Sequence, residues 1–435
     1  MRTSGKERER GGPARARGSS VIPRLSGESP AVLLPDDQDW KMPQRTQHSE
    51  RAPALTTHIA RIETFLFRSE VREPVKTSFG SIPWRSVLLL RVEDSDGAEG
   101  WGEVWCNFPP YSADNKQRLI ETIIAPAALG MPCDRPDEVW RALTHKMHRW
   151  VLQTGETGPI AACLAGLDLA VWDLDSRRRG LPLRSLLNPD CARRSVPAYA
   201  SGLNPDTAED TVDRAREAGF TAFKVKVAFG LEQDLATVDG IRARLRDGER
   251  LMVDANQGWD LAQAREAVVQ LSNRGIGWIE EPIAADSSPA EWAELAKLSV
   301  SPLAGGENVS GFEAFQDMIR SGSHRVIQPD LLKWGGVTGC HSVARAAVSE
   351  GLTYCPHWLG SVIGLIASAQ VLAAVGGTGL LEHDVMDNPL REALTDDFPR
   401  VSEGRFPLPT GPGIGFTPCL EQAERWLLDK KSFQL

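Results

Sequence analysis

Six residues with chemically active side chains recur through the second half of the chain, each at the end of a short, mostly apolar stretch. The six are Asp254, Glu280, Glu307, Asp330, His357 and Glu382, separated by 26, 27, 23, 27 and 25 residues. Each gap has the length of one strand followed by one helix. Because parallel strands joined by helices end at the same rim, this spacing predicts a β/α barrel with one site built at that rim.

The stretch that defines the pattern best is LMVDANQGWD, residues 251–260. It predicts a short buried strand that ends on Asp254 and is followed by Asn and Gly before a helical pattern resumes. From residue 196 onward the chain alternates in this way, with strand candidates that begin at residues 196, 222, 250, 278, 302, 325, 352 and 379. Helical patterns separate them, and a tail with several prolines and glycines replaces the last helix. The predicted fold class is therefore α/β, a modified TIM barrel of the (β/α)7β type.

The chain ahead of the barrel has a different texture. Residues 57–190 predict an α+β module with a strand at 57–68, a loop at 71–84, a hairpin at 86–105 and helices further on. Residues 1–56 are rich in Arg, Pro, Gly and Ser and predict a disordered leader or a misassigned start, with Met42 as the alternative first residue. We expect the barrel to span residues 191–384 and residues 385–435 to return to the first module.

The composition limits the classes of partner. The chain has 435 residues, 41% of them hydrophobic, and a formal net charge of -9. This charge argues against nucleic acid and anionic membrane surfaces as partners and favours small molecules. The sequence contains no run of about 18 apolar residues, the length that would predict a membrane span. The seven cysteines lack any CxxC spacing, so they predict neither a disulfide framework nor a cysteine zinc site, and we expect a cytoplasmic protein.

Asp254, Glu280 and Glu307 end three consecutive predicted strands. A single carboxylate in such a place is more often a solvated acid or a helix cap than a metal ligand. Three carboxylates that converge in one cavity would repel each other unless a cation lay among them. Oxygen ligands of this kind suit Mg²⁺, with water or substrate oxygens completing the octahedron. We therefore expect a Mg²⁺ site.

Two lysines stand on one face of the second barrel strand. Lys224 and Lys226 belong to AFKVKV, and the period of two places both side chains on the same side. The simpler alternative is a solvated face of an edge strand, but a barrel strand has no edge. Since neighbouring ammonium groups lower each other's pKa, Lys226 is the predicted base and Lys224 its tuner or a substrate anchor.

Asp330 and His357 end the sixth and seventh strands. A histidine followed by Trp358 could be a packed core residue. A carboxylate on the neighbouring strand end, however, could accept a hydrogen bond from the imidazole, fix its tautomer and support an imidazolium. Lys226 and His357 would then face each other across the cavity. Two bases on opposite sides of one carbon permit a proton to be removed and returned.

These residues lie in motifs that resemble the enolase superfamily, and within it the mandelate racemase subgroup. The motifs are KVK at 224–226, DAN at 254–256, EEP at 280–282, GGE at 305–307, QPD at 328–330 and PH at 356–357. The resemblance implies that the first module and the tail form a capping domain. It also implies Mg²⁺-assisted removal of a proton next to a carboxylate, which gives an enolate.

Carried over residue by residue, the resemblance makes Asp254, Glu280 and Glu307 the metal ligands. It makes Lys226 one base and the His357–Asp330 dyad the other, and it gives Glu382 the part of an acid that hydrogen-bonds the substrate carboxylate. Relatives of the muconate cycloisomerase and dipeptide epimerase type carry a base lysine where this chain has Asp330, so those activities are disfavoured.

The substrate is predicted from weaker signals. The loops at 71–84 and 105–115 are expected to set specificity, and the expected substrate contacts are Asn256, Thr77, Phe79, Tyr111 and Trp358. EHDVMDNPLREAL, residues 382–394, resembles acid-sugar members, especially dehydratases and aldaro-lactone cycloisomerases. The leading prediction is dehydration or lactone cycloisomerisation of a hydroxylated sugar acid. The alternatives are a racemase or epimerase of a 2-hydroxy acid and a catalytically silent barrel used for binding, and relatives lead us to expect a homo-oligomer.

Overall fold

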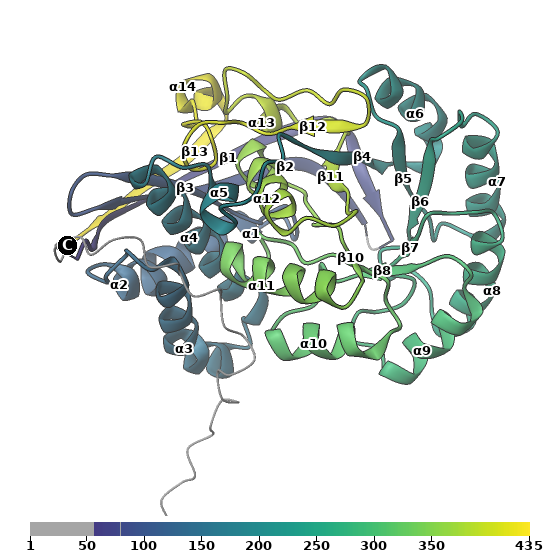
Figure 1. Ribbon diagram of the computed structural model, residues 1–435, viewed down its shortest axis with the longest axis horizontal. Helices are drawn as coiled ribbons and strands as arrows, with labels where there is room; N and C mark the ends of the chain where they lie inside the picture. Colours follow the sequence, from purple (N-terminus) through teal and green to yellow (C-terminus); the bar gives the residue numbers. More distant parts are fainter. Residues whose placement is uncertain (1–55, 79) are drawn as a thin grey trace, which may run out of the picture. The chain divides into compact units, whose positions relative to one another are not determined.

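The computed structural model describes residues 56–78 and 80–435, drawn in colour in Figure 1. The predicted leader at 1–56 lies outside the described residues, apart from Thr56. The described part contains an antiparallel sheet with its helices and a curled parallel sheet surrounded by helices. This arrangement confirms the predicted fold class.

The parallel sheet carries the residues that the spacing singled out. Its strands follow the order β10-β9-β8-β7-β6-β5-β4-β11, so neighbours in the sequence are neighbours in the sheet, and the last strand lies beside the first. The strands are β4 (Ser195–Leu203), β5 (Ala222–Lys226), β6 (Arg250–Asp254), β7 (Ile279–Glu280), β8 (Leu303–Gly305), β9 (Val326–Ile327), β10 (Thr353–Tyr354) and β11 (Leu381–Asp384). Every strand falls within or overlaps the stretch predicted for it.

A helix follows each of the first seven strands and covers the outside of the sheet (Figure 1). These helices are α6 (Ala208–Glu217), α7 (Leu231–Arg242), α8 (Leu261–Ser272), α9 (Pro289–Leu298), α10 (Phe312–Ser321), α11 (Gly336–Ser349) and α12 (Val362–Val375). Asp260 and Ser288 begin α8 and α9 with capping boxes, in which the side chain accepts from the backbone N–H three residues on. The chain after β11 forms no eighth helix of this kind, as the tail prediction required.

The two ends of the parallel sheet meet at Gly379. A Cβ atom added there would lie 1.7 Å from the carbonyl oxygen of Tyr354, so only glycine permits this approach of β10 to the chain entering β11. The backbone N–H of Leu380 also donates to Sγ of Cys355 across 3.3 Å. The ring of strands is therefore closed by close packing and a side-chain contact.

The antiparallel sheet has the order β13-β1-β2-β3. Its strands are β1 (Ile59–Thr77), β2 (Gly80–Asp94), β3 (Glu99–Val104) and β13 (Leu427–Gln434), the last of which pairs with β1. The C-terminal end of the chain therefore completes the first module, as predicted. The helices of this region are α1 (Ser112–Leu119), the π-helix Ile120–Ile124, α2 (Ala125–Ala128), α3 (Pro136–Thr154), α4 (Thr157–Arg178) and α5 (Leu183–Leu187).

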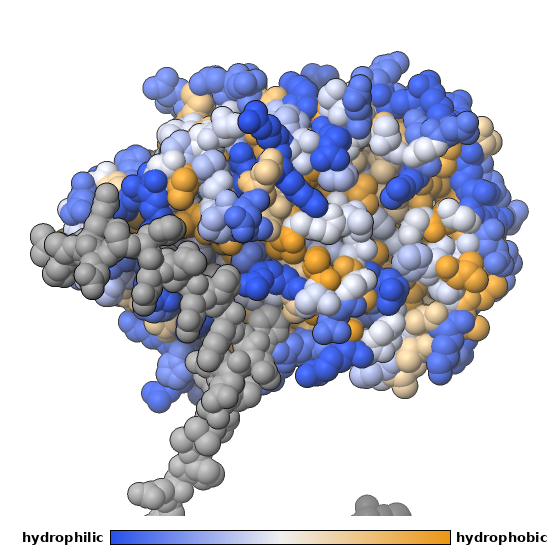
Figure 2. Space-filling model, viewed as in Figure 1, coloured by the Kyte–Doolittle hydropathy of each residue, from blue (hydrophilic) through white to orange (hydrophobic). Residues whose placement is uncertain are grey.

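The long helix α4 packs against β3 through glycines. A Cβ atom at Gly102 would lie 2.0 Å from the carbonyl oxygen of Gly166, so the strand and the helix approach backbone to backbone. Helix α4 is long and apolar enough to cross a membrane, but 78% of its apolar window is buried inside the protein. Its apolar character is explained by its place in the core. On the face shown in Figure 2, hydrophilic side chains dominate the outer ring of barrel helices.

Residues 71–84 correct one expectation. Within residues 71–78 and 80–84 there is no open loop: β1 and β2 continue as a hairpin with Val75 opposite Ile82 and Thr77 opposite Gly80. The register shifts between Glu70 and Val75, and such a bulge accommodates Pro74, which has no N–H to give to the ladder. The tail holds the remaining short elements: α13 (Pro389–Glu392), β12 (Arg405–Pro407), α14 (Leu420–Ala423) and the 3-10 turn Glu424–Trp426, while the turn Pro205–Thr207 precedes α6.

Candidate active site

The strand register brings the predicted rim residues together. Lys226 pairs with Asp254 across β5 and β6, and Asp254 pairs with Glu280 across β6 and β7. Beyond β9 and β10, Asp330 and His357 form an isolated parallel bridge. Glu382 lies on β11 next to β4. Apart from Glu382, the second residue of β11, these positions are at or just beyond the carboxyl ends of their strands, where β/α barrels place their sites.

Each predicted metal ligand faces a cation. Asp254 Oδ2 lies 2.7 Å from Lys226 Nζ, and Glu280 Oε1 lies 2.6 Å from Lys224 Nζ. Glu307 forms an ion pair with His357 Nε2 and lies 3.8 Å from Lys333 Nζ. Buried carboxylates require such partners, because desolvation otherwise favours the neutral acid.

The donor set fits a hard cation. All three side chains offer carboxylate oxygens at one rim, and Asp254 and Glu280 are almost fully buried. Oδ1 of Asn256, beside Asp254, is buried without a hydrogen-bond partner and could accept from a bound molecule. Within residues 56–78 and 80–435, no three acidic, His or Cys side chains are drawn together as a metal-binding group. The ligand assignment therefore rests on donor chemistry and position.

The two lysines differ from expectation in their electrostatics. Burial lowers the pKa of Lys226 and so does Lys224, but Asp254 outweighs both and raises the pKa above its ordinary value. Burial also lowers the pKa of Lys224, but Glu280 and Glu382 raise it well above its usual range. The prediction that the ammonium neighbours would make Lys226 a base of lowered pKa is therefore wrong in this structure, because the surrounding carboxylates dominate.

His357 and Asp330 form the predicted dyad. Nδ1 of His357 lies 2.6 Å from Oδ2 of Asp330, whose other oxygen accepts the backbone N–H of Leu332 at 2.7 Å. Burial disfavours the imidazolium, but Glu307, Glu382 and the bond to Asp330 together hold the pKa of His357 well above its ordinary value. The dyad therefore supports a charged imidazolium with a fixed ring orientation.

The pKa of Glu382 is lowered in this structure, which favours the ionised carboxylate. Burial raises its pKa, but Lys224, 2.8 Å away, and His357 lower it below the ordinary value. The hydroxyl of Ser201 donates to Oε1, and the backbone N–H of Trp358 donates to Oε2 at 3.1 Å. In this structure Glu382 therefore accepts hydrogen bonds and forms an ion pair with Lys224.

Four of the predicted catalytic and metal-binding residues line one cavity of about 300 Å³, whereas Asp254, Glu280, Lys224 and Asp330 are not part of its lining. Lys226 and His357 both lie in its wall, together with Glu307 and Glu382. Among the predicted substrate contacts, Thr77, Asn256 and Trp358 line it. Tyr111 is 67% exposed and is not part of the lining, and Phe79 lies outside the described residues.

Other lining residues were not predicted individually, although four of them, Val75, Ile82, Trp105 and Phe108, lie in the segments 71–84 and 105–115 that were expected to set specificity. Val75 and Ile82 come from the hairpin, Trp105 and Phe108 follow β3, and Lys333 follows Asp330. Asn308 stands directly after Glu307 and lines the same cavity. Its position beside a predicted ligand was the only signal for Asn308 in the sequence.

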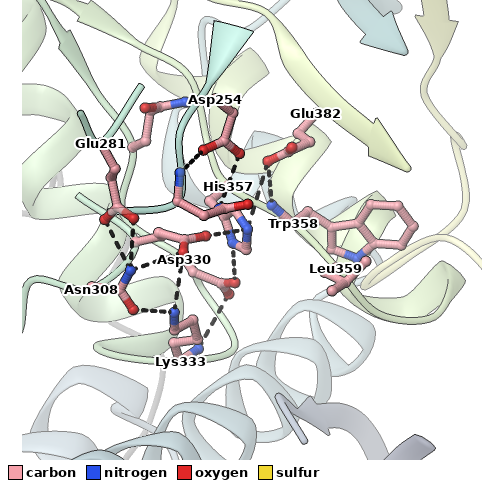
Figure 3. Close-up of polar contacts among 12 residues, drawn as sticks. Asp254, Glu281, Asn308, Asp330, Lys333, His357, Trp358, Leu359 and Glu382 are labelled. Atoms are coloured by element: carbon pink, nitrogen blue, oxygen red, sulfur yellow. Dashed lines mark hydrogen bonds and ion pairs between the residues drawn. The ribbon is translucent and has the colours of Figure 1, made fainter. Parts of the chain in front are cut away.

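A fourth acid lies beside the predicted ligands. Figure 3 shows Asn308 between Glu281 and Lys333: its Nδ2 donates to Glu281, and its Oδ1 accepts from Nζ of Lys333. Glu281 has a φ of 40°, in the left-handed region, and burial, Glu307 and Asp254 raise its pKa to about 8. The EEP motif thus provides two carboxyl groups with different partners: Glu280 faces Lys224, and Glu281 faces Asn308.

A capped β/α barrel with carboxylates, lysines and a histidine at its rim is the architecture of an enzyme of the enolase superfamily. Residues 206–423 match the family "Enolase C-terminal domain-like", and residues 61–188 match "Mandelate racemase / muconate lactonizing enzyme, N-terminal domain". The chain belongs to the mandelate racemase/muconate lactonizing enzyme family, as its motifs predicted.

Curated relatives include acid-sugar enzymes. The D-galactarolactone cycloisomerase of Agrobacterium fabrum is 27% identical and the match covers 82% of this chain and 95% of the relative. The L-talarate/galactarate dehydratase of Salmonella typhimurium is 31% identical and the match covers 78% of this chain and 82% of the relative. The chain is therefore similar to a cycloisomerase and to a dehydratase whose names refer to acid sugars.

Solved structures share the fold over most of the chain. A mandelate racemase/muconate lactonizing enzyme from Bordetella bronchiseptica RB50 is 44% identical, with a TM-score of 0.79 and coverage of 85% of this chain and 99% of that chain. A racemase from Streptomyces coelicolor A3(2) with bound magnesium is 26% identical, with a TM-score of 0.76 and coverage of 85% of this chain and 100% of that chain.

Proposed function

We propose that this protein is a Mg²⁺-dependent enzyme that removes the proton next to the carboxylate of a hydroxylated sugar acid and catalyses dehydration or lactone cycloisomerisation. The observation that carries the proposal is that Lys226 and His357 line one cavity together with Glu307 and Glu382. The curated relatives named above support an acid-sugar substrate. A cavity of about 300 Å³ supports a small substrate.

Asp254, Glu280 and Glu307 would hold the ion. The chemistry that Mg²⁺ supplies when bound is stabilisation of the second negative charge that forms when a carboxylate becomes an enolate. The structure with bound magnesium among the similar proteins supports this choice of metal. The protein's own residues would supply the proton transfers and the orientation.

The two bases have separate tasks. One of Lys226 and His357, in its neutral form, would take the proton next to the carboxylate, and the other, in its charged form, would donate a proton to a leaving hydroxyl or return one to carbon. Asp330 holds the imidazole ring of His357 by its Nδ1, which leaves Nε2 toward Glu307 and the cavity. Oδ1 of Asn256 has no hydrogen-bond partner among the described residues and could accept a hydrogen bond from a substrate hydroxyl.

The hairpin and cap complete the walls of the site. Val75, Thr77 and Ile82 from the hairpin line the cavity with Trp105 and Phe108. Apolar and polar contacts are thus both present, and they would exclude water from the reacting carbon. We propose that these residues select the substrate, that the protein works in the cytoplasm, and that it forms a homo-oligomer.

The test is a screen of aldonic, uronic and aldaric acids and their lactones with Mg²⁺. A 2-keto-3-deoxy product identifies dehydration, and opening or rearrangement of a lactone identifies cycloisomerisation. Because the same two bases suit a racemase, each acid is also incubated in D₂O, where deuterium uptake with formation of both epimers identifies epimerisation. Absence of any metal-dependent turnover or exchange across the library would refute the proposal and favour a silent barrel.

A further inference from the structure

We propose that Asn308, anchored by Glu281 and Lys333, is a positioning residue that holds the carboxylate of Glu307 in the orientation required for metal binding. The inference deepens the proposed function and depends on it for the metal. It adds a role for three residues that lie outside the predicted set of ligands and bases. Figure 3 shows these side chains in contact beside the rim.

The amide of Asn308 is held at three points. Its Nδ2 donates to Oε1 and Oε2 of Glu281 at 2.9 and 3.0 Å, and to Oε1 of Glu307 at 2.9 Å. An amide nitrogen has two hydrogens, so one can serve each carboxyl group. Asn308 thereby connects the predicted ligand to its buried acidic neighbour.

Lys333 fixes which way the amide points. Its Nζ donates to Oδ1 of Asn308 at 2.8 Å, and an ammonium group can only donate. A flipped amide would set the Nδ2 hydrogens against the ammonium and the Oδ1 oxygen against two carboxyl groups. The Nδ2 group is therefore kept toward Glu281 and Glu307.

Lys333 is in turn held by the cap. Its Nζ lies 4.9 Å from the ring centroid of Trp105, and the backbone N–H of Trp105 donates to the carbonyl oxygen of Leu332 at 3.2 Å. A cation over an indole face is an attractive contact. The orientation of Glu307 is thus linked through Lys333 to the module that completes the cavity.

Glu281 provides the rigid end of the arrangement. Its side chain is almost fully buried, and its backbone has a φ of 40°. Asn308, by contrast, faces the cavity. Outer partners of metal ligands commonly change metal affinity by about 10- to 100-fold when they are removed. A loss of this size is the expected effect of removing Asn308.

The experiment measures the affinity of the full-length protein for Mn²⁺ alone, from the free-ion signal in electron paramagnetic resonance. Asn308→Ala is expected to weaken binding at least 10-fold, and Glu281→Leu to do the same. Glu281→Gln keeps an acceptor for Nδ2 and is expected to stay within about threefold of the wild type, by the same positioning reasoning. The double variant Glu281→Leu/Asn308→Ala should be no weaker than the worse single variant, because both changes remove one unit.

Controls separate positioning from folding and charge. Asn273→Ala, at the exposed end of α8, should bind Mn²⁺ as the wild type does. Circular dichroism and thermal unfolding in EDTA should be the same for all variants. Unchanged affinity of Asn308→Ala overturns the inference, and so does a loss in Glu281→Gln as large as in Glu281→Leu, since that result would assign Glu281 a role through its charge. Failure of the wild type to bind Mn²⁺ would instead overturn the proposed function itself.

Discussion

Replacing Asp330 by Asn tests the dyad while leaving its shape unchanged. In the wild type, Oδ2 of Asp330 lies 2.6 Å from Nδ1 of His357, and Oδ1 accepts the N–H groups of Leu332 and Lys333 at 2.7 and 3.2 Å. An asparagine can retain Oδ1 for these backbone groups. Its Nδ2 would then point its hydrogens at Nδ1 of His357. Because an imidazolium also carries a hydrogen on Nδ1, that hydrogen would lose its acceptor.

The magnitude follows from the bond that is lost. A hydrogen bond between charged groups contributes about 1.5 to 3 kcal/mol, and Asp330 is buried, so water does not replace it. At about 1.4 kcal/mol for each factor of ten, proton transfer by His357 should slow by roughly 10- to 150-fold. The pKa of His357 should fall, because the bond to Asp330 is one of the causes that raise it.

The assay is deuterium exchange at the carbon next to the carboxylate, measured in D₂O with Mg²⁺ on each epimer of the substrate found in the acid library. Exchange at the face served by His357 should fall in Asp330→Asn, and exchange at the face served by Lys226 should stay near the wild-type rate. Lys226→Met should give the mirror-image result. Equal exchange at both faces in folded Asp330→Asn would refute the dyad, and loss at both faces in either variant would refute the separation of the two bases.

Three further predictions concern the metal, pH and packing. EDTA should abolish turnover, and Mg²⁺ should restore it. In calorimetry, Asp254→Asn should bind Mn²⁺ at least 10-fold more weakly than the wild type. Tight binding of Mn²⁺ by this variant would exclude Asp254 as a ligand. Burial lowers the pKa of His324 to about 4, so below about pH 6.5 the unfolded chain takes up the proton first and the fold loses stability as the pH falls. In urea titrations from pH 7.5 to 5, the free energy of unfolding should therefore fall more steeply for the wild type than for His324→Phe. The two slopes should differ by up to about 1.4 kcal/mol per pH unit. Parallel curves for the two proteins would contradict this prediction. Gly102→Ala, whose Cβ would meet the backbone of α4, should lower the free energy of unfolding in urea by about 3 kcal/mol or more. Gly158→Ala, with open space around the new Cβ, should change it by about 1 kcal/mol or less. Similar values for both variants would disprove the packing argument.

The sequence was sufficient for the barrel because each strand carries its own signal. Short apolar runs, the intervening helical patterns and the capping residues are local, and the regular gaps between Asp254, Glu280 and Glu307 follow from one strand and one helix per repeat. The return of the C-terminal strand to β1 was also foreseen, because a tail without a barrel helix has to pack elsewhere. The hairpin at 71–84 was missed, because its prolines resemble loop residues and only the bulge in its pairing accommodates them.

The identity of the chemical residues was set by the sequence, but their partners were decided by the tertiary structure. Spacing alone could not show that Lys224 faces Glu280 and Glu382, or that Asp254 raises the pKa of Lys226 and Lys224 lowers the pKa of Glu382. Electrostatic effects depend on distances between groups that are far apart in the chain, and these distances exist only after the barrel closes.

The same reason applies to the walls of the cavity and to Asn308. Local patterns determined that this chain forms a capped barrel with acids, lysines and a histidine at one rim. Only the folded chain decided that Trp105 from the cap meets Lys333 from the barrel, and that Glu281 and Glu307 share one amide. Contacts between distant segments carry no periodic signal, because they arise from the packing of whole elements and not from the order of neighbouring residues.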